Sequence, residues 1–304
     1  MAIGEIVLTL TEEDVALDPD FYQVHSCLIS ILHIQTIQSL VEKVPAYTKK
    51  SVHSNLVTLA SLAFMQCMCA SILPISPSTK QSYIAAIENA LGKNVEVTQY
   101  KSSEALGAMS ERFDLTPSVD KWLRNLQGKS TFTVRRGWAK AFGYLRSSKV
   151  NETLVALCDA IETDADVEVR RNALQSIKLI CSREKVQGTR PLSVRNPDGD
   201  GDLSLRIWSA VIACLDDYSA DSRGDVGSWI RMAACESLVP LFKTAPVDLG
   251  IVTIGKLLRL SVERMDRVRQ AAGKTLHSIP ANLLDVEVIR YLDGLEGDDS
   301  RTNG

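Results

Sequence analysis

Residues 169–180 read VRRNALQSIKLI, where an aliphatic residue and an arginine precede small or apolar residues at fixed offsets. The positions i, i+4, i+8 and i+11 form one stripe along a helix with about 3.6 residues per turn, and they are Val169, Ala173, Ile177 and Ile180. A single helix cannot bury such a stripe by itself. The stretch therefore indicates one half of a helix pair that packs against its neighbours in a repeat array.

The same pattern occurs at three further places, residues 134–145, 230–241 and 268–279. The arginines at its second position are 35, 61 and 38 residues apart, and they are Arg135, Arg170, Arg231 and Arg269. The two short intervals match the period of about 40 residues of HEAT-like helix pairs. The long interval equals one repeat plus roughly twenty residues, and residues 184–202, which contain glycines, prolines and the run DGDGD, supply that insertion.

Helical periodicity also covers the remainder of the chain, and no segment shows sustained strand alternation. Helices that would pair with the clear copies are predicted at residues 152–162, 203–216 and 247–264. Earlier helices, separated by prolines at positions 45, 74, 77 and 117, are predicted at residues 21–42, 51–73, 80–91, 96–113 and 118–126. The sequence thus predicts an all-α, HEAT/armadillo-like helical-repeat solenoid.

The domain organisation follows from the same pattern. We expect one continuous HEAT-like array over residues 1–293, with weak repeats in 1–130, clearer repeats in 131–293 and the loop insertion at 184–202. The last residues, 294–304, are predicted to be a disordered tail.

Composition narrows the class of protein. A net charge of -3, with 45% hydrophobic and 23% charged residues, fits a soluble globular chain and disfavours nucleic-acid binding. The N-terminus lacks the basic region of a secretory signal. Residues 56–73 are uncharged but contain several polar side chains, so we expect a helix buried between neighbours and no insertion into a membrane.

Candidate chemistry is sparse. The seven cysteines show no metal-ligand spacing and are interpreted as reduced, buried thiols. The four histidines are scattered, no pairing of a nucleophile with a base is recognisable, and no phosphate-binding loop occurs. The DGDGD run lacks the glycine and glutamate that a calcium loop would need further on. We therefore assign no catalytic residue, no metal ligand and no cofactor.

The predicted turns between paired helices carry aspartates, notably Asp166 and Asp266. Such a carboxylate can accept hydrogen bonds from the free N–H groups at a helix start, or pair with an arginine one turn into the helix. Stacked repeats would then share a regular ladder of aspartates and arginines, with a purely architectural role.

Residues 215–231 read LDDYSADSRGDVGSWIR and are far more polar than a short turn between helices requires. In one interpretation the segment is structural: Asp225 caps the next helix, Gly224 takes a left-handed backbone, and Arg223 pairs with Asp217 or Asp221. In the other it is an edge that recognises a partner, formed by Asp216, Asp217, Tyr218, Asp221, Ser222, Arg223, Asp225 and Trp229. A loop can do both. A cation or catalytic site is disfavoured because Arg223 lies within the cluster as a counter-charge.

Three segments resemble one known family in order and spacing. Residues 216–231 resemble the DDY-x-x-DSRGDVG-x-W-[VI]-R segment of the tubulin-folding cofactor D family. Residues 134–145 are similar to its RRG-x-x-x-ALG-x-L segment, and residues 170–181 to its RR-x-[AG]-LKAI-x-x-IC segment. The resemblance covers residues 80–280 and concerns the C-terminal portion of a family whose members are much longer.

The resemblance implies a cytosolic HEAT-repeat protein that is not itself an enzyme. It would bind β-tubulin and act with tubulin-folding cofactors C and E and an Arf-like small GTPase in assembling or dismantling the αβ-tubulin heterodimer. Activation of GTP hydrolysis would belong to the assembled complex, and association with microtubules is left open. No contact with tubulin is implied for any single residue. The alternative is a generic HEAT-repeat scaffold or adaptor without a tubulin role.

Overall fold

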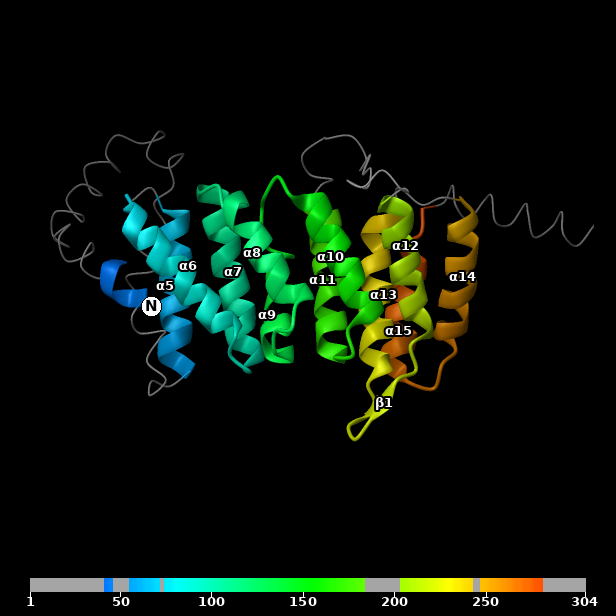
Figure 1. Cartoon of the computed structure of the whole chain (residues 1–304). Helices are drawn as coiled ribbons and strands as arrows, with labels where there is room; N and C mark the ends of the chain where they lie inside the picture. The colour runs from blue at the N-terminus through cyan, green and yellow to red at the C-terminus, as the bar shows by residue number, and fades with distance from the viewer. Residues whose placement is uncertain (1–40, 46–54, 72–73, 184–202, 243–246, 281–304) are drawn as a thin grey trace, which may run out of the picture. The chain divides into compact units, whose positions relative to one another are not determined.

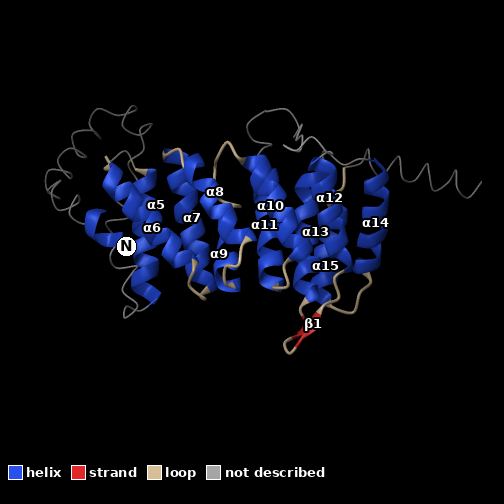
Figure 2. Cartoon of the chain, in the orientation of Figure 1, coloured by secondary structure: helices blue, strands red, loops and turns tan. Residues whose placement is uncertain are grey.

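The computed structural model describes residues 41–45, 55–71, 74–183, 203–242 and 247–280. Within them helices predominate, and Figure 2 shows a single short pair of strands. The chain divides into two compact units, Met1–Thr153 and Leu154–Gly304. A single array running through both units stays a prediction. The predicted helix at 21–42 lies largely outside the described residues, and the insertion at 184–202 and the tail at 294–304 lie wholly outside them.

The first unit is a stack of helices in which α7 contacts α5, α6 and α9, while α8 packs on α9. Two tryptophans form its centre: the rings of Trp122 and Trp138 stack with centroids 5.2 Å apart, and both are fully buried. Helix α5 thus contacts α7, and α7 contacts α9. Such contacts between alternate helices along a stack are typical of a helical repeat. The helices are α5 (Asn55–Ala70), α6 (Pro77–Leu91), α7 (Glu96–Arg112), α8 (Thr116–Gln127) and α9 (Phe132–Ala141).

The second unit repeats this packing around α13, which lies between α11 and α15 (Figure 1). Helix α14 packs on α15, and α12 packs on α13. The elements are α10 (Val150–Thr163), within which the boundary between the units falls, α11 (Val167–Arg183), α12 (Leu203–Ala213), η1 (Cys214–Asp216), α13 (Gly227–Leu241), α14 (Val247–Ser261) and α15 (Asp266–His277).

The predicted apolar stripes form the core of the second unit. All four stripe positions of α11 and all four of α13 are buried, as are Val268, Ala272 and Ile279 in the copy on α15. Burial of each valine, leucine or isoleucine of these stripes stabilises the fold by about 1.5–3 kcal/mol, and each alanine contributes less. The predicted fold class, an all-α helical repeat, is therefore confirmed in each unit.

Proline positions differ from the sequence prediction. Pro77 and Pro117 were expected to separate helices, but each lies in the first turn of one, α6 and α8. A first-turn residue has no helical partner for its N–H, and the fixed φ of proline suits that position. Pro240 lies inside α13, within the predicted copy at 230–241, although its ring removes a helical hydrogen bond.

The uncharged helix α5 packs against α7 and has a buried face that includes Leu62, Met65 and Met68. Its polar groups have partners: the Ser61 hydroxyl donates to the carbonyl of Val57 at 2.8 Å, and Thr58 accepts from Lys93 at 3.1 Å. These contacts agree with a helix packed among neighbours. None of the helices in the described part of the chain is both long enough and apolar enough to span a bilayer.

Candidate partner-binding site

The polar segment between α12 and α13 folds as a small β-hairpin, which the sequence did not predict. Strands β1 (Ala220–Asp221) and β2 (Gly224–Asp225) pair antiparallel, with Ala220 opposite Asp225. We call residues 217–226 the hairpin, and it projects beyond the ends of α12 and α13 (Figure 1). Gly224 has φ +99°, the left-handed region that glycine adopts without strain, as predicted for this position.

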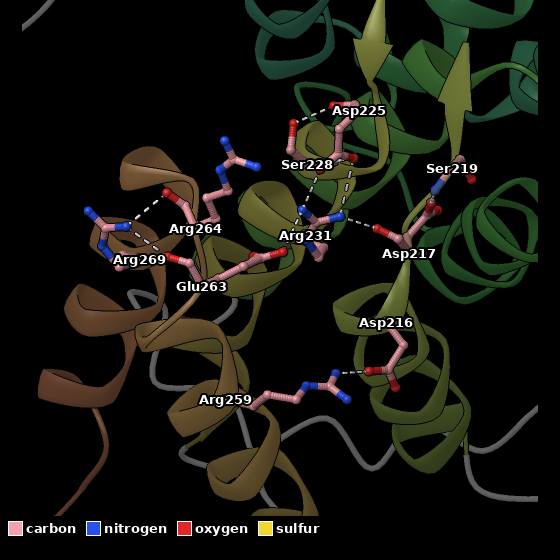
Figure 3. Close-up of polar contacts among 10 residues, drawn as sticks. All are labelled: Asp216, Asp217, Ser219, Asp225, Ser228, Arg231, Arg259, Glu263, Arg264 and Arg269. Carbon is pink, nitrogen blue, oxygen red and sulfur yellow. Dashed lines mark hydrogen bonds and ion pairs between the residues drawn. The ribbon is translucent and has the colours of Figure 1, made fainter.

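Arg231, one turn into α13, is completely buried at the base of the hairpin. Its guanidinium donates to the Asp225 carboxylate at 2.8 Å, to Glu263 at 2.9 Å and to the backbone carbonyl of Asp217 (Figure 3). The ring of Tyr218 covers it at 4.2 Å from the centroid. One cation thus joins both sides of the hairpin to the turn that follows α14.

Asp225 has two roles at the start of α13. Its carboxylate accepts the backbone N–H of Ser228 at 3.0 Å, although the helix begins at Gly227 and Val226 occupies the position before it. The predicted capping bond is therefore present, formed from one residue further upstream. The hydrogen bond from Arg231 lowers the pKa of Asp225, and burial, acting in the opposite direction, does not cancel it.

Asp217 and Asp216 connect the hairpin to the helices on both sides. The Asp217 side chain pairs with Arg170 on α11 and accepts the backbone N–H of Ser219 at 2.9 Å. Asp216 pairs with Arg259 (Figure 3) and with Lys256, both on α14. Burial raises the pKa of both carboxyls, but their hydrogen bonds and the nearby cations outweigh it, so both values are lowered.

The tip of the hairpin is exposed, from residue 218 to residue 224. Arg223 pairs there with Asp221 at 2.7 Å and with Glu168 of α11 at 3.2 Å. Its guanidinium also lies 5.0 Å from the centre of the Trp229 ring, and that of Arg171 lies 5.8 Å from the same ring. Of the two predicted partners of Arg223, Asp221 is observed, whereas Asp217 binds Arg170 instead.

Gly227 is a structurally constrained position at the base of the hairpin that sequence reasoning missed. A Cβ atom built there would lie 2.4 Å from the carbonyl oxygen of Asp217, a distance that side chains do not tolerate. The Gly227 N–H donates to the carbonyl of Ser219 at 2.8 Å. The signal was a second glycine three residues after Gly224. Sequence reasoning also missed five residues that contact this segment, because they lie far from it in sequence. They are Glu168, Arg171, Lys256, Arg259 and Glu263.

The remaining predicted repeat residues have dissimilar partners. Asp166 accepts the N–H groups of Glu168 and Val169 and thus caps α11. Asp266 instead pairs with Arg269, which also donates to the carbonyls of Glu263 and Arg264. Arg135 donates to the carbonyl of Ser130. Three arginines of the pattern pair with aspartates, Arg170 with Asp217, Arg231 with Asp225 and Arg269 with Asp266. Their other acceptors differ from one copy to the next, and a regular ladder of aspartates and arginines stays a prediction.

The four aspartates of the segment are all engaged by cations of the chain itself. Asp216 and Asp217 pair with side chains of other helices, Asp221 pairs with Arg223, and Asp225 pairs with Arg231. In the described part of the chain, no group of three or more histidine, cysteine, aspartate or glutamate side chains has the arrangement of a metal site. What the arrangement offers is a hairpin anchored by buried charge and exposed at its tip.

In the residues that the structure describes, the fold and this hairpin together define an all-α helical-repeat protein with a projecting, ionically anchored connection. Residues 252–296 match the family described as Tubulin folding cofactor D C terminal. The chain is also 26% identical over 200 residues to Tubulin-specific chaperone D of Dictyostelium discoideum, an alignment that covers 55% of this chain. These matches confirm its resemblance to tubulin-folding cofactor D. The chain spans only 13% of the length of that relative.

Proposed function

We propose that the chain binds β-tubulin and acts as part of a tubulin-folding cofactor. Its partners would be cofactors C and E and an Arf-like small GTPase, and the joint task is assembly or dismantling of the αβ-tubulin heterodimer. Any stimulation of GTP hydrolysis belongs to the complex, and the chain itself is not an enzyme. The proposed location is the cytoplasm, and association with microtubules is left open. The similarity to Tubulin-specific chaperone D supports this proposal.

The observation that carries the proposal is the contrast between the base and the tip of the hairpin. The base is held by Arg231, which is fully buried, and by the close backbone approach at Gly227. Tyr218, 54% exposed, lies over the buried Arg231, and the tip presents the exposed side chains of Ser222 and Arg223. Tyrosine and arginine are residues that often dominate binding energy, and an anchored loop loses little conformational entropy when a partner binds.

The mechanism needs no reaction centre. Helical repeats present broad surfaces to a folded partner. A single tubulin subunit exposes the surface that its partner subunit normally covers, and a broad complementary surface would keep that area from aggregating. The hairpin would form one edge of the contact, with Asp216 and Trp229 at its flanks.

A second function, a generic scaffold or adaptor without tubulin, rests on a different observation. Each aspartate of the 216–225 segment is already paired within the chain, so architecture alone gives a reason for these charges. In that case the hairpin would only join two repeats, and changes at its exposed tip would leave partner binding unchanged.

A pull-down of purified β-tubulin by the immobilised chain separates the two functions. The double variant Asp217→Ala/Arg223→Ala and the milder Arg223→Ala, which changes only the exposed tip, are compared with wild type. Arg146→Ala is the matched control, because its exposed pair with Glu111 lies in the first unit. We expect both hairpin variants to lose tubulin and the control to retain it. Equal capture by all four proteins would eliminate the role of the hairpin.

A further inference from the structure

The second unit contains a groove of about 450 Å³, which is lined by residues of α11, α13 and α15. Its apolar part consists of Met232, Val239, Pro240 and Ala271. Val239 is 38% exposed, which is unusual for an aliphatic residue of a buried helix such as α13. Contiguous apolar surface with a polar rim is typical of a protein interaction site.

We call the charged and polar residues that line the groove its rim and the apolar ones its floor, and the charged residues of the rim are predominantly cationic. Lys178, Arg267 and Lys274 lie along it, against the single carboxylate of Glu236. Glu236 is already paired with Lys178 at 2.8 Å, so it does not neutralise the other two cations. Arg267 and Lys274 are both exposed, and neither has an ionic partner in the described part of the chain. They are two helical turns apart on α15, which separates them by about 10 Å along the helix axis.

We propose that this groove binds an acidic segment of a partner protein, with carboxylates on Arg267 and Lys274 and aliphatic side chains on Met232, Val239 and Pro240. The cations select negative charge, and the apolar floor selects a polypeptide that carries hydrophobic side chains between its acidic residues. A nucleic acid would satisfy the cations but not the apolar floor. The net charge of -3 also makes this local positive rim a contrast to the rest of the chain.

The groove is separate from the hairpin. Helix α13 begins next to the hairpin at Gly227, whereas its groove residues are Met232 to Pro240, in the later turns. None of the hairpin residues lines the groove. The inference therefore goes beyond the proposed function, and the two surfaces can succeed or fail independently.

Fluorescence anisotropy with the full chain tests the proposal. The probe is a fluorescein-labelled peptide of about twelve residues, long enough to pass both cations of the rim as a helix. Leucines occupy one face of its helical pattern and glutamates the rest. Two further peptides replace the glutamates by glutamine or the leucines by alanine. A single-stranded oligonucleotide of equal charge serves as the other class of ligand.

The variants are Lys274→Glu and Arg267→Glu, with Arg264→Glu as the matched control. Arg264 is exposed, lies near the start of α15 and does not line the groove, so it changes the net charge equally. We expect about tenfold weaker binding for each groove variant and little change for the control. Binding should weaken as salt is added, because exposed charges are screened. The hairpin variant Arg223→Ala should bind the peptide like wild type.

Several outcomes would overturn the proposal. Equal affinity for the glutamine peptide would remove the role of charge, and equal affinity for the alanine peptide would remove the apolar floor. Tighter binding of the oligonucleotide would assign the rim to nucleic acid. Equal weakening by Arg264→Glu and Lys274→Glu would mean a general charge effect and no site. Because all three substituted side chains are exposed, unchanged melting temperatures are expected and would exclude misfolding.

Discussion

Arg231 of α13 donates a hydrogen bond of 2.9 Å to Glu263, which lies in the turn between α14 and α15. This bond connects the repeat that contains the hairpin to the repeat formed by α14 and α15. The arginine side chain is fully buried and that of Glu263 is 16% exposed. In such surroundings a charge is tolerated only when it is paired and hydrogen-bonded. The same guanidinium binds Asp225, so one side chain contributes both to the structure of the hairpin and to the packing of two repeats.

Removal of the Arg231 side chain should destabilise the folded chain. We expect Arg231→Ala to lower the free energy of unfolding by about 3 kcal/mol, because it leaves Glu263 and Asp225 without their counter-charge. Arg146→Ala removes only an exposed pair with Glu111 and should cost less than about 1 kcal/mol. Urea denaturation followed by circular dichroism measures both. Similar losses for the two variants would contradict the central role of Arg231.

The free energy of unfolding should depend on pH through the carboxylates of the hairpin and of Asp216 beside it. The pKa values of Asp216, Asp217 and Asp225 are lowered in the folded chain from an ordinary value of 3.8. A lowered folded-state pKa contributes stability that is complete above the unfolded value and is lost as the pH falls through the folded one. We therefore expect the free energy of unfolding to decline below about pH 4.

Asp217→Asn is the variant that isolates this effect. The amide still accepts the Ser219 N–H but cannot provide the charge that Arg170 needs. The variant should be less stable than wild type at neutral pH, and the difference should shrink as the pH falls below about 4. Unfolding curves recorded at a series of pH values supply the comparison. A difference that stays constant through this range would disprove the assignment.

The backbone approach at Gly227 gives a prediction about sterics. Gly227→Ala places a methyl group 2.4 Å from the Asp217 carbonyl oxygen, so it must displace the hairpin and should cost about 2 kcal/mol. Gly273→Ala, on α15, is the control because its Cβ has nothing within 4 Å. Alanine should stabilise that helix by about 0.5–1 kcal/mol. Thermal unfolding should shift in opposite directions for the two variants.

Thiol reactivity should follow burial. Burial raises the pKa of Cys158, Cys214 and Cys235 to about 12, whereas Cys67 is only partly buried. Because the thiolate is the reactive form, a maleimide reagent near pH 7.5 should label Cys67 well before those three. Mass spectrometry of peptides after timed labelling measures the order. Early labelling of Cys214 would mean that the packing beneath the hairpin opens readily.

Local patterns were sufficient for the helices. The spacing of Ile230, Ala234 and Leu238 predicted both a helix and its buried face, since a side chain's position on a helix depends only on its offset along the chain. Gly224 was predicted for the same reason, because the backbone at a turn is a local property. Pro77 and Pro117 misled the prediction of helix starts, as a proline in a first turn and a proline in a break look alike in sequence.

Local sequence patterns could not identify the partners of the charged residues. Sequence placed Arg223 among several aspartates, but it could not choose between Asp217 and Asp221, nor find Glu168. The predicted pairing of aspartates with arginines did not specify that Arg170 would reach Asp217 in the next repeat. Two residues that are 47 positions apart meet only after the helices have packed.

The amino-acid sequence by itself determined that this protein is an all-α helical repeat and that its polar segment is an interruption between two helices. Those properties depend on periodicity, which is a relation between near neighbours in the chain. Only the tertiary structure decided that the segment is an anchored hairpin and that three helices share a groove with a cationic rim. Both features arise because packing brings distant residues within a few ångströms, where burial and charge make each partner matter.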